Sequence, residues 1–210
     1  MNIPETVELT SIEITTEPLE DKKQDLNGLP QEAQGQLYEL SHLAQKKPQK
    51  AIERIKDILT RHRKHPVLLN YLASAYSRAG KKRESEETVK ENYQLFNDYL
   101  FAKINYAQIC LDNEQPEKIP AIFDFKLDLK YLYPHRTKFH VNEAIAFWHI
   151  MAIYHYQIGE KNKSKRYYSM MKKLDKKHSL TRNARKVIHP SILKTILQRL
   201  DKKLEKKLES

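Results

Sequence analysis

The feature that most constrains the fold of this 210-residue chain is a set of small and apolar residues that recurs every 34 residues. The clearest copy begins at Pro66, and its fourth, seventh, eighth, eleventh and fifteenth residues are Leu69, Leu72, Ala73, Tyr76 and Gly80. Spacings of three and four place apolar residues on one face of a helix, and a glycine after such a run ends the helix. The pattern therefore predicts a pair of helices that is repeated along the chain.

The same pattern extends to both sides of this copy. In a unit that begins at Glu32, positions twenty and twenty-one are Ala51 and Ile52. In a unit that begins at Leu100, positions seven, eight, eleven and twenty-four are Tyr106, Ala107, Cys110 and Phe123. After 11 extra residues a fourth unit begins at Ile145, and its matching residues are Trp148, Met151, Ala152, Gly159, Ser164, Tyr168 and Met171.

This arrangement resembles the tetratricopeptide repeat (TPR) family, whose 34-residue unit is two antiparallel helices. The resemblance covers residues 32–178 and implies an all-α solenoid, a right-handed superhelix of four units near 32–65, 66–99, 100–144 and 145–178. In that family a small residue at position eight lets the two helices of a pair approach closely. Glycine at position fifteen ends the first helix, and a small residue at position twenty admits the helix of the next unit. An irregular helical bundle is the alternative to a solenoid.

Two units depart from the pattern. The first unit has Gly35, Glu39 and Lys46 where a large apolar residue, a small residue and a glycine are expected, so its first helix is the least certain. In the third unit, positions four, fifteen and twenty-one are Lys103, Glu114 and Pro120. Pro120 predicts a second helix that starts late or is kinked. The 11 extra residues predict a longer or broken helix and a loop near residues 133–136.

The two ends of the chain differ from the repeats. Residues 1–32 carry 8 acidic and 2 basic groups, and we expect residues 1–30 to be a mostly disordered acidic tail. The stretch VELTSIEI, residues 7–14, alternates like a short strand and could add to the edge of a partner's sheet. For residues 179–210 we expect a basic linker and then an amphipathic helix from Ser191 that caps the repeats. Self-association or binding to a membrane surface are its alternatives.

No short motif points to catalysis. The chain has only four glycines and contains no GxSxG, no HExxH and no glycine-rich phosphate loop. A single cysteine excludes an internal disulfide and a cysteine-based zinc site. His149 and His155 are six residues apart, which is not a spacing that places two metal ligands together on a helix. We therefore expect a noncatalytic protein with no metal and no cofactor.

The resemblance implies a binding function instead. In TPR proteins the first helices line a concave groove that holds a peptide or helix of a partner protein. The exposed positions that the resemblance assigns to this groove include Asn70, Ser74, Ser77, Phe101, Gln108, His149 and Tyr156. We therefore expect a scaffold or adaptor that binds another protein.

Charge supports an alternative function. Residues 160–210 contain 17 Lys or Arg and 5 Asp or Glu, a net charge of +12. A nucleic acid, or the ribosome, is the alternative partner, because clustered cations bind a phosphate backbone. The candidate residues are Lys161, Lys163, Lys165, Arg166, Lys172 and Lys173. The start of the chain lacks the features of a signal peptide, and no apolar run approaches the ~18 residues needed to cross a bilayer. We expect a cytoplasmic protein that does not insert into membranes.

Overall fold

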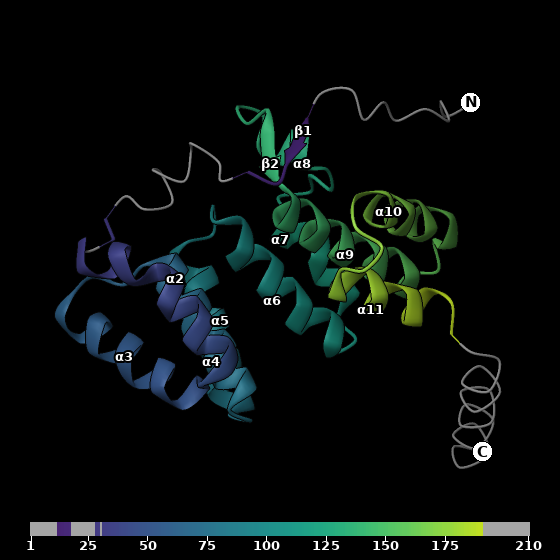
Figure 1. Cartoon of the computed structure of the whole chain (residues 1–210). Helices are drawn as coiled ribbons and strands as arrows, with labels where there is room; N and C mark the ends of the chain where they lie inside the picture. The colour runs from purple at the N-terminus through teal and green to yellow at the C-terminus, as the bar shows by residue number, and fades with distance from the viewer. Residues whose placement is uncertain (1–11, 18–27, 30, 191–210) are drawn as a thin grey trace, which may run out of the picture. The chain divides into compact units, whose positions relative to one another are not determined.

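The computed structural model describes residues 12–17, 28–29 and 31–190, and these residues are mostly helical (Figure 1). The chain divides into two compact units, residues 1–143 and 144–210, with the boundary inside helix α9 (Val141–Gln157). The predicted predominance of helix is confirmed, with two short strands added.

In the first compact unit, residues 1–143, the first described element is strand β1 (Glu13–Thr15), and five regular helices follow it. These are α2 (Gln31–Lys46), α3 (Pro48–Arg61), α4 (Pro66–Arg78), α5 (Lys82–Leu95) and α6 (Leu100–Asp112). A 3-10 turn (Pro116–Lys118), two short helices and a strand follow: α7 (Ile119–Ile122), α8 (Leu129–Leu132) and β2 (Lys138–His140). Prolines at the first positions of α3 and α4 lie where a missing backbone N–H costs nothing.

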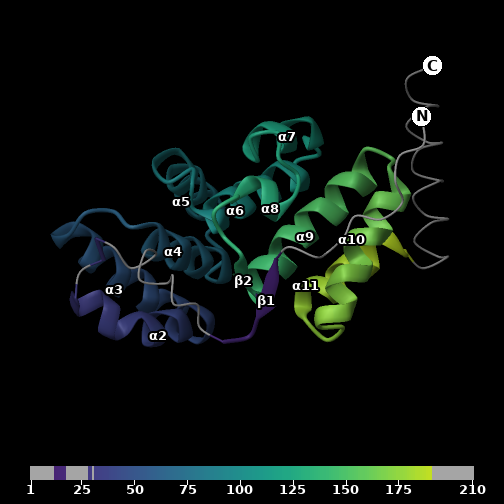
Figure 2. The same cartoon turned by 90° about the horizontal axis from the view of Figure 1, so that it is seen from above.

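Each helix from α2 to α6 packs on the next one in the chain (Figure 2). In addition, α2 contacts α4, and α4 contacts α6. The core between these helices is apolar, and α3 alone buries Ala51, Ile52, Ile55 and Ile58 at helical spacing. The predicted packing of consecutive helices in pairs is therefore confirmed for α2 with α3 and for α4 with α5.

Helix α2 is regular over 16 residues, although the sequence pattern was weakest there. Its buried residues are Ala33, Leu40 and Ala44. The positions that the 34-residue phase places inside, Tyr38 and Glu39, are exposed instead. Only Lys47 separates α2 from α3, whereas three residues separate α4 from α5. Because the connection is two residues shorter, a different set of α2 residues faces the core.

The second helix of the third repeat starts late, as Pro120 predicts, because α7 begins at position twenty whereas α5 and α10 begin at position seventeen. It is also short. The chain leaves α7 through Asp124 and Phe125, which both have positive φ, 52° and 58°. Phe123 still occupies the core position predicted for it and is fully buried. The predicted loop near residues 133–136 lies between α8 and β2.

Lys103 stands at the fourth position of the third unit, where the pattern expects a large apolar residue, and it is buried. Its Nζ donates to the backbone oxygen of Ile122 and to Asp124 Oδ2, each at 2.9 Å. A buried ammonium needs such partners because leaving water costs several kcal/mol. The end of α7 and the turn after it therefore supply the hydrogen-bond acceptors that the Lys103 ammonium of α6 requires.

Position fifteen has the same backbone conformation in three units. Gly80 and Gly159 have φ of 75° and 82°, and Glu114, at the same position of the third unit, has φ of 55°. Left-handed backbone is easy for glycine and costs other residues about 1–2 kcal/mol. Glu114 replaces the glycine of the pattern, but the left-handed turn that ends the helix is kept.

Strands β1 and β2 pair in parallel, with Glu13 opposite Lys138 and Ile14 opposite Phe139. Phe139 is fully buried, and Lys138 Nζ lies 3.1 Å from a Glu13 carboxylate oxygen. We expected residues 1–30 to be mostly disordered, with any strand there adding to a partner's sheet. The structure instead pairs residues 13–15 with a later segment of the same chain. The rest of the acidic tail lies outside the described residues, apart from positions 12, 16, 17, 28 and 29.

The second unit contains α10 (Lys161–Leu174), α11 (Ser179–Ile188) and the part of α9 after Glu143. Ser164 Oγ donates to the backbone oxygen of Ala152 at 2.7 Å, joining position twenty to position eight. In the repeat of residues 66–99, Ser85 Oγ donates to the backbone oxygen of Ala73 in the same way at 2.9 Å. Position twenty therefore joins the two helices of one pair, whereas the resemblance implied a contact with the next unit.

Helix α11 lies where a linker was expected. His178 Nδ1 accepts from the Leu180 N–H at its start, and Thr181, Ala184 and Ile188 are buried on one side. Residues 179–188 are therefore a packed helix, and α11 contacts α10. The amphipathic helix predicted from Ser191 lies outside the described residues.

Candidate binding surfaces

The first candidate surface is formed by the exposed sides of α4 and α6, and we call it the α4–α6 surface. Its predicted residues are Asn70, Ser74, Ser77, Phe101 and Gln108. Asn105 Nδ2 on α6 donates to Asn70 Oδ1 on α4, so the two helices are joined side by side. The structure thus brings together the two groups of predicted residues that lie 34 positions apart.

The α4–α6 surface is mostly polar. Ser74 and Ser77 are exposed and carry small polar side chains. Gln108 Nε2 donates to Asp112 Oδ1 at 2.8 Å within α6. Phe101 is half-buried and lies with its ring centre 6.0 Å from that of Tyr99. The surface therefore offers amide groups beside one partly exposed aromatic ring.

His149 and Tyr156, the remaining residues predicted for the groove, belong to α9 and not to this surface. His149 is only 3% exposed, and its Nε2 lies 3.0 Å from Asn183 Oδ1 of α11. The expectation that His149 lines an open groove is therefore wrong for this structure. Its position faces α11, a helix that the sequence pattern did not reveal. Tyr156 is half-buried.

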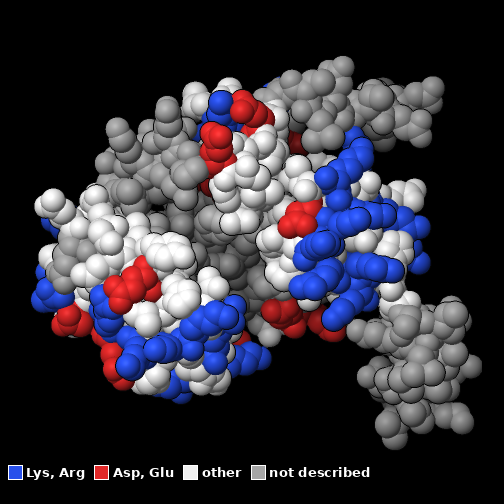
Figure 3. Space-filling view, in the orientation of Figure 1, with Lys and Arg blue, Asp and Glu red and all other residues white. Residues whose placement is uncertain are grey.

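The second candidate surface is the exposed side of α10, α11 and their connection, which we call the α10–α11 surface. All eleven Lys and Arg between residues 144 and 190 are exposed, whereas this segment has only two acidic residues, Glu160 and Asp175. Figure 3 shows these basic side chains gathered over α10 and α11. The basic residues are Lys161, Lys163, Lys165, Arg166, Lys172, Lys173, Lys176, Lys177, Arg182, Arg185 and Lys186.

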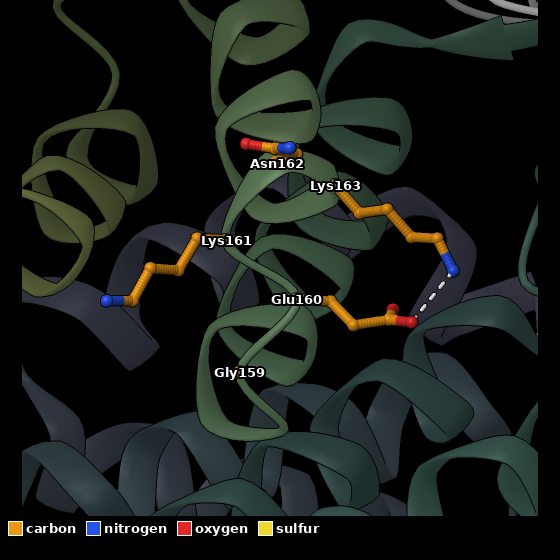
Figure 4. Close-up of a pocket in the computed structure, with 5 residues that line it drawn as sticks. All are labelled: Gly159, Glu160, Lys161, Asn162 and Lys163. Carbon is orange, nitrogen blue, oxygen red and sulfur yellow. Dashed lines mark hydrogen bonds and ion pairs between the residues drawn. The ribbon is translucent and has the colours of Figure 1, made fainter.

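The helical period decides which of these cations act together. Lys161, Lys165 and Lys172 follow one another at intervals of four and seven, so they lie on one side of α10. Lys163 points away from Lys161 and donates to Glu160 Oε1 at 3.0 Å (Figure 4). Lys163 was predicted with the other five basic residues, but its charge is largely neutralised by Glu160.

A pocket of about 330 Å³ lies at the start of α10 (Figure 4). Its lining residues are Gly159, Glu160, Lys161, Asn162 and Lys163, which follow one another in the chain. A catalytic site usually needs polar groups that converge from several elements. One turn of chain with an internal ion pair does not supply such a set.

Two tyrosines interrupt the basic residues of α10, but both rings are engaged within the unit. Tyr167 stacks on His155 with ring centres 5.5 Å apart and planes 7° apart. Tyr168 meets the ring of His189 edge-on at 5.7 Å. The α10–α11 surface therefore presents cations and small polar groups rather than open aromatic rings.

His155 is a buried titratable group beneath this surface. It is 4% exposed, and its Nδ1 lies 2.6 Å from Glu160 Oε2. Burial lowers the pKa of His155 below its ordinary value, and the hydrogen bond that the Glu160 carboxylate accepts opposes this effect only in part. Lys163, beyond Glu160, also lowers the pKa of His155, while Tyr154 and Tyr167 are its aromatic neighbours.

Replacing His155 with phenylalanine is expected to make the protein less sensitive to acid. The pKa of His155 in the folded chain lies below its value of 6.5 in the unfolded chain. The contribution of neutral His155 to the free energy of unfolding is therefore fully present above about pH 6.5, and it is lost as the pH falls through the folded pKa. The melting temperature of the wild type, followed by circular dichroism, should fall further between about pH 7.5 and 5 than that of His155→Phe. His62→Phe, at an exposed site, should behave like the wild type; equal falls for all three proteins would contradict the prediction.

Comparison with known proteins adds no family. No family model, no curated protein and no solved structure matches the chain. Among the described residues, no three His, Cys, Asp or Glu side chains are grouped as metal ligands would be. Within the same residues, no helix has the length and apolar character needed to cross a bilayer.

Proposed function

We propose that the chain is a TPR-like array whose α4–α6 surface binds a peptide or helix of another protein, without catalysis. The repeated hydrogen bond from position twenty to position eight supports the array. The left-handed residue at position fifteen in three units supports it too. Contacts of α2 with α4, and of α4 with α6, are those that stacked helix pairs make.

The observation that carries the binding proposal is the hydrogen bond between Asn70 and Asn105. It holds α4 and α6 side by side, so that residues from both helices border one surface. An extended peptide or helix exposes polar groups that amides such as Asn70 and Gln108 can pair with. Phe101 offers an apolar contact, and aromatic residues carry a large share of binding energy in protein interfaces.

The test blocks the surface without disturbing the core. Ser74→Arg/Ser77→Arg adds two long side chains at exposed positions of α4, while Gln94→Arg/Asn97→Arg adds the same charge at exposed positions in and after α5. Crosslinking mass spectrometry from native lysate first identifies a protein that crosslinks beside α4 and α6. The affinity of that purified partner segment is then measured by calorimetry at low and moderate salt.

The Ser74→Arg/Ser77→Arg protein is expected to bind the partner segment at least about tenfold more weakly, since loss of a few central contacts removes most interface energy. The Gln94→Arg/Asn97→Arg protein should bind like the wild type, and moderate salt should change the affinity little. Equal binding by both variants would refute the proposed surface.

A further inference from the structure

The α10–α11 surface is the most one-sided charged area among the described residues, and it has no role in the proposed protein interface. Eleven exposed cations face two acidic residues, and one of these, Glu160, is already shared between Lys163 and His155. Within the described part of the chain, no carboxylate pairs with Lys161, Lys165, Lys172 or Lys173. A dense surface of exposed cations attracts a polyanion.

We propose that the α10–α11 surface binds the phosphate backbone of double-stranded nucleic acid, independently of sequence. Lys161 and Lys173 are separated by twelve residues of α10, or about 18 Å of helix. Duplex DNA carries about one negative charge per 1.7 Å of its axis, so a helix of this length can face several phosphates. Arg182, Arg185 and Lys186 on α11 widen the contact beyond one helix.

The surroundings of the cations favour nucleic acid over a membrane. A helix that lies on a membrane buries an apolar face in the lipid. In this unit the apolar sides of both helices are already used, because Met171 of α10 and Ala184 and Ile188 of α11 are buried. Leu174, at 38% exposed, is the most exposed large apolar residue of these two helices.

The same surroundings favour nucleic acid over an acidic protein. The centres of protein interfaces are depleted in lysine and enriched in aromatic residues. Here lysine dominates, and the rings of Tyr167 and Tyr168 pack on His155 and His189. The engagement of both rings also favours duplex over single strand, because single-strand binding proteins stack bases on open aromatic side chains.

The experiment measures fluorescence anisotropy of a labelled DNA duplex of about 20 base pairs and mixed sequence, at several salt concentrations. The variant Lys161→Gln/Lys165→Gln/Lys172→Gln removes three cations from the exposed side of α10. The matched control, Lys50→Gln/Lys56→Gln/Lys90→Gln, removes three exposed lysines from α3 and α5. Circular dichroism verifies that all proteins are folded. Single-stranded DNA of the same length, phosphatidylserine vesicles and poly-glutamate serve as competing ligands.

Each phosphate contact should lower the affinity about threefold between about 50 and 200 mM salt, so a wild-type face with four contacts loses about 100-fold. The α10 triple variant should bind the duplex at least about tenfold more weakly at low salt and reduce the salt slope by about 3. The control variant should stay within about twofold of the wild type. The proposal is overturned if both triple variants weaken binding equally, if single strand is bound more tightly than duplex, or if only vesicles or poly-glutamate are bound.

Discussion

Replacing Asp124 with asparagine is expected to lower the free energy of unfolding by about 2 kcal/mol. The reason is Lys103, whose side chain is only 3% exposed and whose ammonium has Asp124 as its one carboxylate partner among the described residues. Asparagine keeps the size and tolerates the left-handed backbone at this position, so the change removes mainly the charge. The estimate is below the usual cost of breaking a buried pair because Asp124 itself is 58% exposed.

The double variant Lys103→Met/Asp124→Asn separates charge from shape. Methionine restores an apolar residue at position four, and replacing a buried ion pair by apolar side chains is often close to neutral. We therefore expect Lys103→Met to lie within about 1 kcal/mol of the wild type, and Asp124→Asn to cost little in that background. Urea unfolding followed by circular dichroism gives the free energy of unfolding of the wild type, the two single variants and the double variant. An equal cost of Asp124→Asn in both backgrounds would show that Lys103 is not the cause.

Ala152→Leu is expected to lower the free energy of unfolding of the compact unit that contains α9 and α10 by about 3 kcal/mol. Ala152 is fully buried at position eight, and its backbone oxygen accepts from Ser164 Oγ at 2.7 Å. A leucine in this space must push α10 away from α9 or adopt a strained conformation. Urea unfolding followed by the fluorescence of Trp148, the single tryptophan of the chain, reports on this pair of helices.

Glu39→Leu is the matched control, because Glu39 occupies position eight of the first repeat, residues 32–65. Glu39 is exposed and pairs with Arg54 at the surface, so its replacement should cost less than about 1 kcal/mol. Leucine introduced at the same repeat position should thus differ several-fold in its effect on the free energy of unfolding. Similar costs at both sites would mean that position eight has no special packing role.

The helix pairs were predictable because their signals are local. Ala73 and Gly80 each depend on neighbours within about one helix, and the 34-residue period repeats those signals. The burial of Lys103 was not predictable, since its partner Asp124 lies 21 residues away on a turn whose backbone conformation no motif reveals. The set of α2 residues that faces the core was not predicted, because it depends on the length of the connection between α2 and α3, which is the single residue Lys47.

The predicted residues of the two candidate surfaces differ in exposure. Ser74, Ser77 and all six predicted basic residues of α10 are exposed, whereas Asn70, Phe101 and Gln108 are half-buried. His149 was misplaced because α11 covers it, and α11 has no counterpart in the repeat pattern. The separate behaviour of Lys163 could have been anticipated, because Glu160 lies three residues before it and spacings of three bring side chains together on a helix.

The pairing of β1 with β2 has a consequence for how the chain reaches this structure. About 125 residues separate Ile14 from Phe139, and closing a loop of that length costs about 4 kcal/mol of chain entropy. During synthesis, β1 leaves the ribosome long before its partner exists, while α2 to α6 can assemble from contacts close in sequence. Among the described elements, the strand pair is therefore expected to form last, and its amides to exchange with solvent before those of helices α2 to α6.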